Sequence, residues 1–141
     1  MNKSGVLHKL MLVLILLVGF GVALVWPTLQ KKLDVHYARQ AAQIGRQLAQ
    51  AEQTFQQRNG FYTADFGQLG LDLPCPAAVK DGHTVLHCRH YDFMLEQADV
   101  IRVSSTKYPK WFTVSLADGS ITCGHEDGSL AGARICAQVD L

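Results

Sequence analysis

The sequence lacks a concentration of charge of either sign. Its 13 Lys and Arg residues are balanced by 12 Asp and Glu residues, which leaves a formal net charge of +1. Neither the basic field typical of nucleic-acid binding nor an acidic tail is therefore present. Lys107 and Lys110 in KYPK form too sparse a basic patch to contact several phosphates. We expect no nucleic-acid partner.

The motifs of the common catalytic sites are also missing. The chain contains no phosphate-binding loop, no GxGxxG fingerprint, no GxSxG nucleophile elbow and no CxxC pair. Scattered Ser, His and Asp residues occur in any chain of this size and carry no argument without such an elbow. We therefore predict a protein that is not an enzyme and that has no cofactor.

What the sequence does contain is one long apolar run near its beginning. From Leu10 to Trp26 every residue is apolar or Gly, and Pro27 follows directly. As a helix these residues would span roughly 26 Å, close to the bilayer's hydrocarbon core, and Val6 and Leu7 extend the run. A signal peptide cut after the small-residue triplet at 21–23 is the rival interpretation. The run is longer than a usual signal-peptide core of about 7–15 residues, so we predict a retained membrane helix.

All four cysteines lie beyond this run, at Cys75, Cys88, Cys123 and Cys136. Evenly placed cysteines in a small anchored domain indicate two disulfides and an oxidising compartment. The sequence allows three pairings, and we select the local one, Cys75–Cys88 with Cys123–Cys136. Paired cysteines leave no free thiol as a nucleophile. They also place the body of the protein outside the cytoplasm, with the N-terminus inside.

The rest of the chain predicts an α+β fold. A narrow apolar stripe with helical spacing follows Pro27, formed by Tyr37, Ala41, Ile44, Leu48, Ala51 and Phe55. Arg58-Asn59-Gly60 supplies a helix end, so 6–27 is the membrane half and 28–59 the amphipathic half of one long helix. Residues 60–82 read as a loop with a short helical turn. Strand patterns in 83–141 predict an antiparallel sheet against which the stripe packs. The predicted strands are 83–88, 90–96, 100–105, 110–116, 120–123 and 134–139.

Two groups of side chains could have a specific function, one as a metal site and the other as a contact surface. In HTVLHCRH, His83 and His87 would share one face of a strand, while Cys88 and His90 would share the other. The four therefore do not converge, and we do not predict a metal site; the same holds for His125. Trp111 and Phe112 are adjacent, so one of them must point away from the inner side of the sheet. Either it packs beneath a loop, or it forms a subunit or adhesive contact.

The order of these features resembles the type IV pilins and type II secretion pseudopilins. In that family a short basic leader ends in Gly, a second Gly lies fourteen residues on and a Pro twenty-two on. Gly5, Gly19 and Pro27 have this register. The stretch ARQAAQIGRQLAQAEQTFQQRNGFYTADFGQLGLDLP is also similar to the family's helix and the loop after it. The resemblance is strong to about residue 75 and follows the general pattern after that.

The resemblance implies a fibre subunit. Residues 1–5 would be a leader, cut after Gly5 by a prepilin peptidase that methylates the new amino group of Val6. The subunit would wait in the bacterial inner membrane, surrounded by lipid. An assembly platform would then extract it into a helical fibre of pilin or pseudopilin subunits. Leu10, Gly19 and Pro27 would lie in the fibre core. Some pseudopilins hold calcium near the position of GHEDG, 124–128, although Glu126 and Asp127 supply fewer oxygens than calcium prefers.

The sequence departs from the family at the start of the helix. Leu10 occupies the slot of a Glu that pairs with a neighbouring subunit's amino terminus, and Val6 replaces the usual Phe. A buried amino terminus without a carboxylate partner costs on the order of several kcal/mol. The departure therefore favours a minor or priming subunit over the main fibre protein. The alternative is a single-pass or secreted extracytoplasmic binding domain that does not polymerise.

Overall fold

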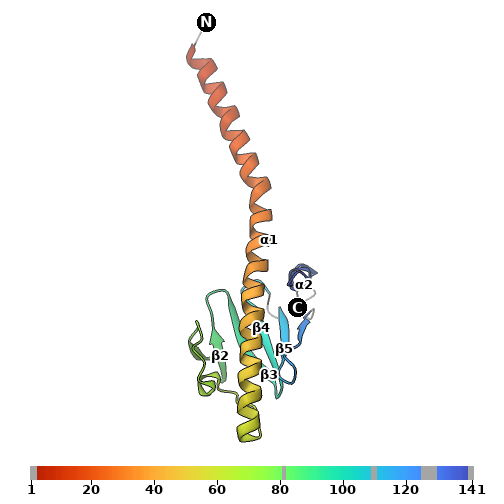
Figure 1. Cartoon of the computed structure of the whole chain (residues 1–141). Coiled ribbons are helices and arrows are strands. Elements are labelled where there is room, and N and C mark those ends of the chain that lie inside the picture. Colours follow the sequence, from red (N-terminus) through yellow and green to blue (C-terminus); the bar gives the residue numbers. More distant parts are fainter. Residues whose placement is uncertain (1–2, 81, 109–110, 125–129, 140–141) are drawn as a thin grey trace. The chain divides into compact units, whose positions relative to one another are not determined.

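The computed structural model describes residues 3–80, 82–108, 111–124 and 130–139. The chain forms two compact units, Met1–Asp34 and Val35–Leu141. The first unit is helical, and the second combines the rest of that helix with a sheet (Figure 1). The predicted α+β class is confirmed.

The long helix α1, Lys3–Asn59, continues through Pro27, so the prediction of one long helix is confirmed. Proline removes one backbone hydrogen bond, but it does not forbid a helix on both sides of it. The helix ends as predicted. Gly60 has φ 83° and its N–H donates to the carbonyl of Gln56 at 2.7 Å, which is the left-handed cap that favours glycine.

Six strands form one antiparallel sheet in the order β1-β2-β3-β4-β5-β6, so each strand pairs with its neighbour in sequence. Short turns suffice for such a meander, and Gly119 at φ 70° lies in the β5–β6 turn. A 3₁₀ turn η1, Phe66–Leu69, lies in the loop after α1, where a short helical turn was predicted. The strands are β1 Ala77–Lys80, β2 His83–His87, β3 Tyr91–Gln97, β4 Val100–Ser105, β5 Phe112–Ser115 and β6 Ile121–Cys123.

Two secondary-structure predictions are wrong. The predicted loop 60–82 contains β1, whose four residues are all exposed and show no alternation of apolar and polar side chains. Its strand state depends on pairing with β2, where Lys80 lies opposite His83. The predicted strand 134–139 overlaps the helix α2, Leu130–Ala137. Ile135 and Cys136 are buried in α2, and Val139 is buried just beyond its end. Over so few residues, apolar positions with this spacing fit a strand as well as a helix.

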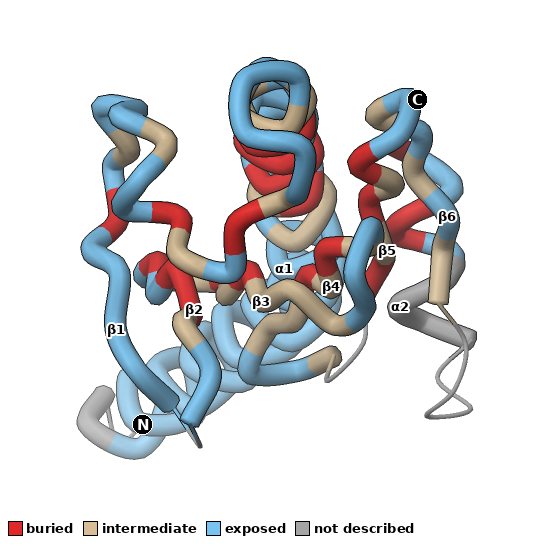
Figure 2. Tube along the Cα trace, turned by 90° about the horizontal axis from the view of Figure 1, so that it is seen from below, coloured by how far each residue is buried: buried red, intermediate tan, exposed pale blue. Residues whose placement is uncertain are grey.

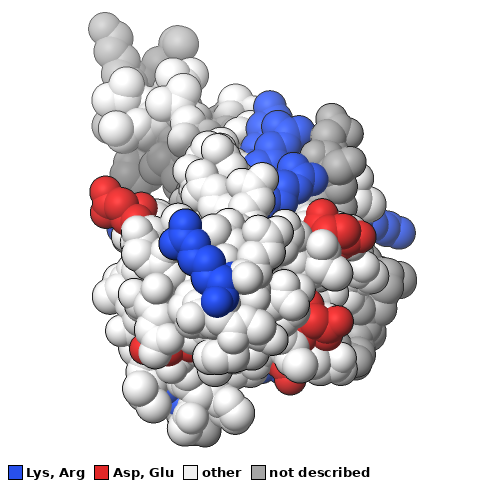
Figure 3. Space-filling model, turned by 60° about the horizontal axis from the view of Figure 1, so that its bottom comes forward, with Lys and Arg blue, Asp and Glu red and all other residues white. Residues whose placement is uncertain are grey.

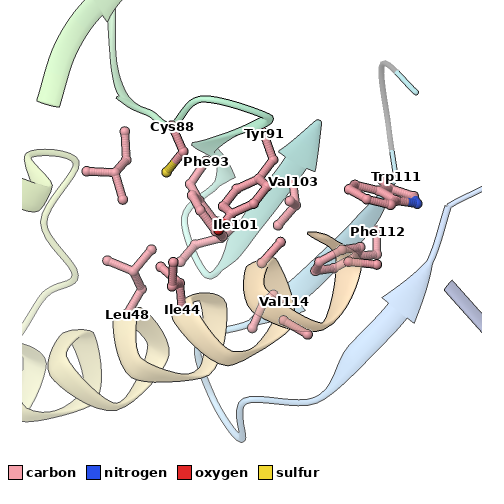
Figure 4. Close-up of a cluster of buried hydrophobic side chains, with 14 of the residues drawn as sticks. Ile44, Leu48, Cys88, Tyr91, Phe93, Ile101, Val103, Trp111, Phe112 and Val114 are labelled. Carbon is pink, nitrogen blue, oxygen red and sulfur yellow. The ribbon is translucent and has the colours of Figure 1, made fainter. Parts of the chain in front are cut away.

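The core lies between the Val35–Asn59 part of α1 and one face of the sheet (Figure 2). Strand register brings Leu86, Phe93, Val103 and Phe112 into one row across the sheet, on the face toward the helix. Ile44 and Leu48 lie on the facing side of α1 (Figure 4). Phe93, Ile101, Val103 and Val114 are fully buried in this cluster.

Small residues let the helix approach the sheet closely. The most buried positions of α1 are Ala38, Ala41, Leu48, Ala49 and Glu52. The predicted stripe is therefore displaced around the helix, because Tyr37, Ala51 and Phe55 are only half-buried at its margin. At Gly45 an added Cβ would lie 2.9 Å from Val114 Cγ2 and 3.7 Å from Phe93 Cε1. A Cβ at this position would therefore force the Val114 side chain or the helix to shift.

Both disulfides pair as predicted. Cys75–Cys88 joins the loop before β1 to the end of β2, and Cys123–Cys136 joins β6 to α2. The structure has no free cysteine. Each bridge closes a short loop, which stabilises a small domain by roughly 2–4 kcal/mol.

We expect Gly45→Ala to destabilise the folded domain despite the better helix propensity of Ala. Propensity favours Ala by about 1 kcal/mol, whereas overpacking a tight contact costs about 1–3 kcal/mol. Denaturant unfolding of the full chain in detergent micelles, followed by Trp111 fluorescence, measures the difference. Adding Val114→Ala should remove the clash, so that Gly45→Ala becomes stabilising in that background. A stabilising Gly45→Ala with Val114 intact would contradict the close approach.

Candidate functional site

The largest functional feature is the apolar part of α1. Its side chains are more than half exposed, with Val6 at 65%, Leu16 at 71% and Trp26 at 58%. Apolar residues surround this part of the helix on all sides, so a single folded domain touching one side would leave the others in water. By length and composition, α1 contains one stretch able to cross a bilayer.

Polar residues bracket this stretch. His8 and Lys9 precede it, Lys31 and Lys32 follow it, and all four are exposed. Lysines at the ends of a membrane helix extend their charged groups into the headgroup region, and Trp26 is the type of residue found at that boundary. The arrangement suits a helix whose two ends lie in opposite interfaces of a membrane.

The residues predicted for processing and for the fibre core all lie on this helix. Gly5, Val6, Leu10, Gly19 and Pro27 follow one another along α1 and do not form a common site. Leu10 is 66% exposed, and an added Cβ at Gly5 or Gly19 would meet nothing within 4 Å. Their surfaces are thus available to lipid, to a peptidase or to other helices.

The histidines of HTVLHCRH have separate surroundings. His87 Nδ1 lies 2.6 Å from Asp92 Oδ1, and Cys88 is in a disulfide. His90 stacks on Tyr37 of α1 with ring centroids 3.9 Å apart, a contact that helps hold the helix on the sheet. Within the described part of the chain, no three His, Cys, Asp or Glu side chains group in a way that could hold a metal ion.

Some predicted candidates fall outside the described residues. They are His125, Glu126, Asp127 and Lys110. The calcium interpretation of GHEDG therefore stays a prediction.

Neighbouring strands bring together the three residue types of a catalytic triad, His87, Asp92 and Ser104, but not in the order that catalysis needs. His87 lies opposite Asp92, and Asp92 lies opposite Ser104. The carboxylate thus stands between the other two residues, whereas a nucleophilic Ser needs the imidazole beside it to accept its proton. The arrangement supplies a hydrogen bond between His87 and Asp92 on the sheet surface.

The aromatic pair after KYPK is entirely internal. Trp111 is 2% exposed and Phe112 1% exposed, and their rings lie 5.9 Å apart. Tyr108 adds a third ring, 5.5 Å from Trp111. Both rings belong to the buried core cluster, so neither is presented on the surface for an adhesive contact.

A buried carboxyl that the sequence analysis missed fixes the loop after α1. Glu52 is fully buried, and its Oε2 accepts a hydrogen bond from the Thr63 N–H at 3.0 Å. Its Oε1 has no hydrogen-bond partner. Burial raises the pKa of Glu52 above its ordinary value of 4.5, and the bond from Thr63 lowers it by a smaller amount. Glu52 lies four positions after Leu48, so its place on the buried side of the helix was readable from the spacing.

We expect Glu52→Gln to flatten the pH dependence of stability. Because the folded pKa is raised, the stability linked to this carboxyl is complete below pH 4.5 and is lost as pH rises through the folded pKa. Gln keeps an acceptor for Thr63 and cannot ionise. Unfolding of the full chain in micelles at a series of pH values should show the variant gaining relative to wild type as pH rises. Asp72→Asn, at an exposed carboxyl, is the matched control, and equal slopes for Glu52→Gln and wild type would refute the interpretation.

Charged side chains elsewhere form no continuous field. On the face shown in Figure 3, basic and acidic residues lie in small groups separated by neutral surface. This face therefore offers no extended track for a polyanion.

Comparison with known proteins identifies no relative: no family model, no curated protein and no solved structure matches the chain.

Proposed function

We propose that the protein is a subunit of a type IV pilus or a type II secretion pseudopilus, and a minor subunit of that fibre. It is held in the bacterial inner membrane before assembly, with its sheet domain outside the cytoplasm. Its role is structural, and its partners are other pilin or pseudopilin subunits, the prepilin peptidase and the assembly platform. The observation that carries the proposal is the apolar part of α1, whose side chains are more than half exposed and which is continuous with the helix that packs on the sheet.

That surface supports a subunit with two environments. A helix that is apolar all round is stable in lipid, and the same side chains are stable in a bundle of like helices. The exposed sides of Leu10, Leu16 and Phe20 can therefore pass from one to the other without exposure to water. The register of Gly5, Gly19 and Pro27 adds a specific link to the pilin resemblance.

The minor role rests on the slot at Leu10. A carboxylate there would neutralise the amino terminus of a neighbouring subunit inside the fibre. Leu10 cannot do so, and the nearest polar residue, Lys9, has the same charge as an amino terminus. In a fibre made only of this subunit, every buried amino terminus would lack a carboxylate partner, which is energetically unfavourable. A subunit at the tip meets no preceding amino group.

A second candidate is a membrane-anchored or released domain that does not polymerise. The missing Glu favours it, and so does the small-residue triplet Gly21-Val22-Ala23, which a signal peptidase could cut. The disulfides suit the same compartment in both cases.

The mass of the mature N-terminal peptide from the native host distinguishes these functions. We expect cleavage after Gly5 and one methyl group on the amino nitrogen of Val6. A peptide beginning at Leu24, or an uncut Met1, would contradict the fibre proposal and favour the second candidate. Long fibres assembled from this protein in the absence of other subunits would contradict the minor role.

A further inference from the structure

The face of the sheet away from α1 carries a small pocket that none of the functions above uses. Val85, Met94 and Arg102 lie opposite one another on β2, β3 and β4. Their neighbours Leu86, Phe93 and Val103 belong to the core beneath α1. Because side chains alternate between the faces of a sheet, the first row points to the outer side. The pocket on this row has a volume of about 230 Å³.

The floor of the pocket is apolar and is formed by Val85 and Met94. Val85 is only 3% exposed, yet it lies outside the main core cluster. It is therefore covered by other side chains on the outer face, among which Met94 is half-buried. The outer face of an antiparallel sheet is often solvated, whereas here Val85 and Met94 form an apolar part of the pocket lining.

The rim of the pocket is basic. Lys80 lies directly opposite His83 in the β1–β2 pair, and Arg102 lies on β4. Two basic residues directly opposite each other gain nothing from the pairing, and they repel when both are charged. Neither Lys80 nor His83 forms an ion pair with any residue the structure describes.

Arg102 forms an ion pair with Glu96, but its hydrogen bonds are incomplete. Its Nε is buried without an acceptor, and its Nη1 lies 3.7 Å from Glu96 Oε1, beyond hydrogen-bond distance. One third of its side chain is exposed, at 33%, and Arg102 is one of the residues that line the pocket. The carboxylate that lines the pocket, Asp92, is already hydrogen-bonded to His87, with Oδ1 2.6 Å from Nδ1.

The geometry points to a binding site for a small organic carboxylate. The planar guanidinium of Arg102 would hold the carboxylate through two N–H donors, Lys80 and His83 would add positive charge or a donor, and Val85 with Met94 would contact the hydrocarbon part. Asp92 and Glu96 at the margin disfavour a dianion, so a monocarboxylate fits better than inorganic phosphate. The volume limits the ligand to a size well below that of a typical drug. This site is independent of whether the chain polymerises.

Benzoate is a suitable probe, because it joins one carboxylate to an apolar ring. We expect it to shift the NMR signals of the Met94 methyl and the Arg102 Nε–H saturably in the full chain in zwitterionic micelles. Benzamide, of the same shape but uncharged, should bind at least tenfold more weakly. Loss of a hydrogen bond to a charged group should make Arg102→Gln weaker by roughly tenfold to a hundredfold.

Two further variants make the test independent of folding defects. Lys80→Gln, at an exposed residue, should weaken benzoate binding by about twofold to fivefold. Arg58→Gln removes the same charge from the exposed end of α1 and should leave binding unchanged. Undiminished binding to Arg102→Gln or Lys80→Gln, benzamide binding as tight as that of benzoate, or tighter binding of inorganic phosphate would each overturn the assignment.

Discussion

The structure depends on how the apolar surface of α1 is kept from water, and the two parts of this helix differ in that respect. The Leu10–Trp26 part of α1 is apolar on every side, and its large apolar side chains are more than half exposed. The part after residue 35 buries one side only, against the sheet. Burying apolar surface contributes roughly 25 cal/mol per Å², so a helix exposed on all sides is stable only where lipid or other helices surround it. This requirement underlies both the proposed membrane placement and the proposed fibre.

The folded domain is organised around the close approach of α1 to the sheet. Gly45 leaves no room for a Cβ against Val114, and small residues on either side of it let the helix lie near the strands. The loop after the helix is fixed by Glu52, which accepts the Thr63 N–H, while Phe66 fills the space beneath it. The disulfides then hold the two ends of the sheet, β1–β2 and β6, to the segments beside them. A small domain needs such links because its core alone provides little stability.

Much of the fold was predictable because its signals are local. The apolar run, the helical spacing after Pro27 and the cap at Gly60 define α1, and alternation defines β2 to β5. The strand β1 was missed because its stability comes from pairing with β2 and not from its own residues. The helix α2 was misread because Ile135, Cys136 and Val139 are apolar and close together, a pattern that fits either element over so few residues. The outer pocket could not be predicted, since only the register of three hairpin pairings brings Lys80, His83 and Arg102 together.

The most direct test of the central claim is the accessibility of the middle of the apolar segment. All native cysteines that the structure contains are in disulfides, so Leu16→Cys provides a single thiol at a position 71% exposed in the isolated chain. In bilayers of the full-length protein we predict that a water-soluble maleimide fails to label Leu16→Cys but labels Gln43→Cys, at an exposed position of the folded domain. Labelling of Leu16→Cys should appear once the bilayer is dissolved and the chain is denatured. Equal labelling of both variants in the intact bilayer would show that the segment lies in water, and it would contradict the account.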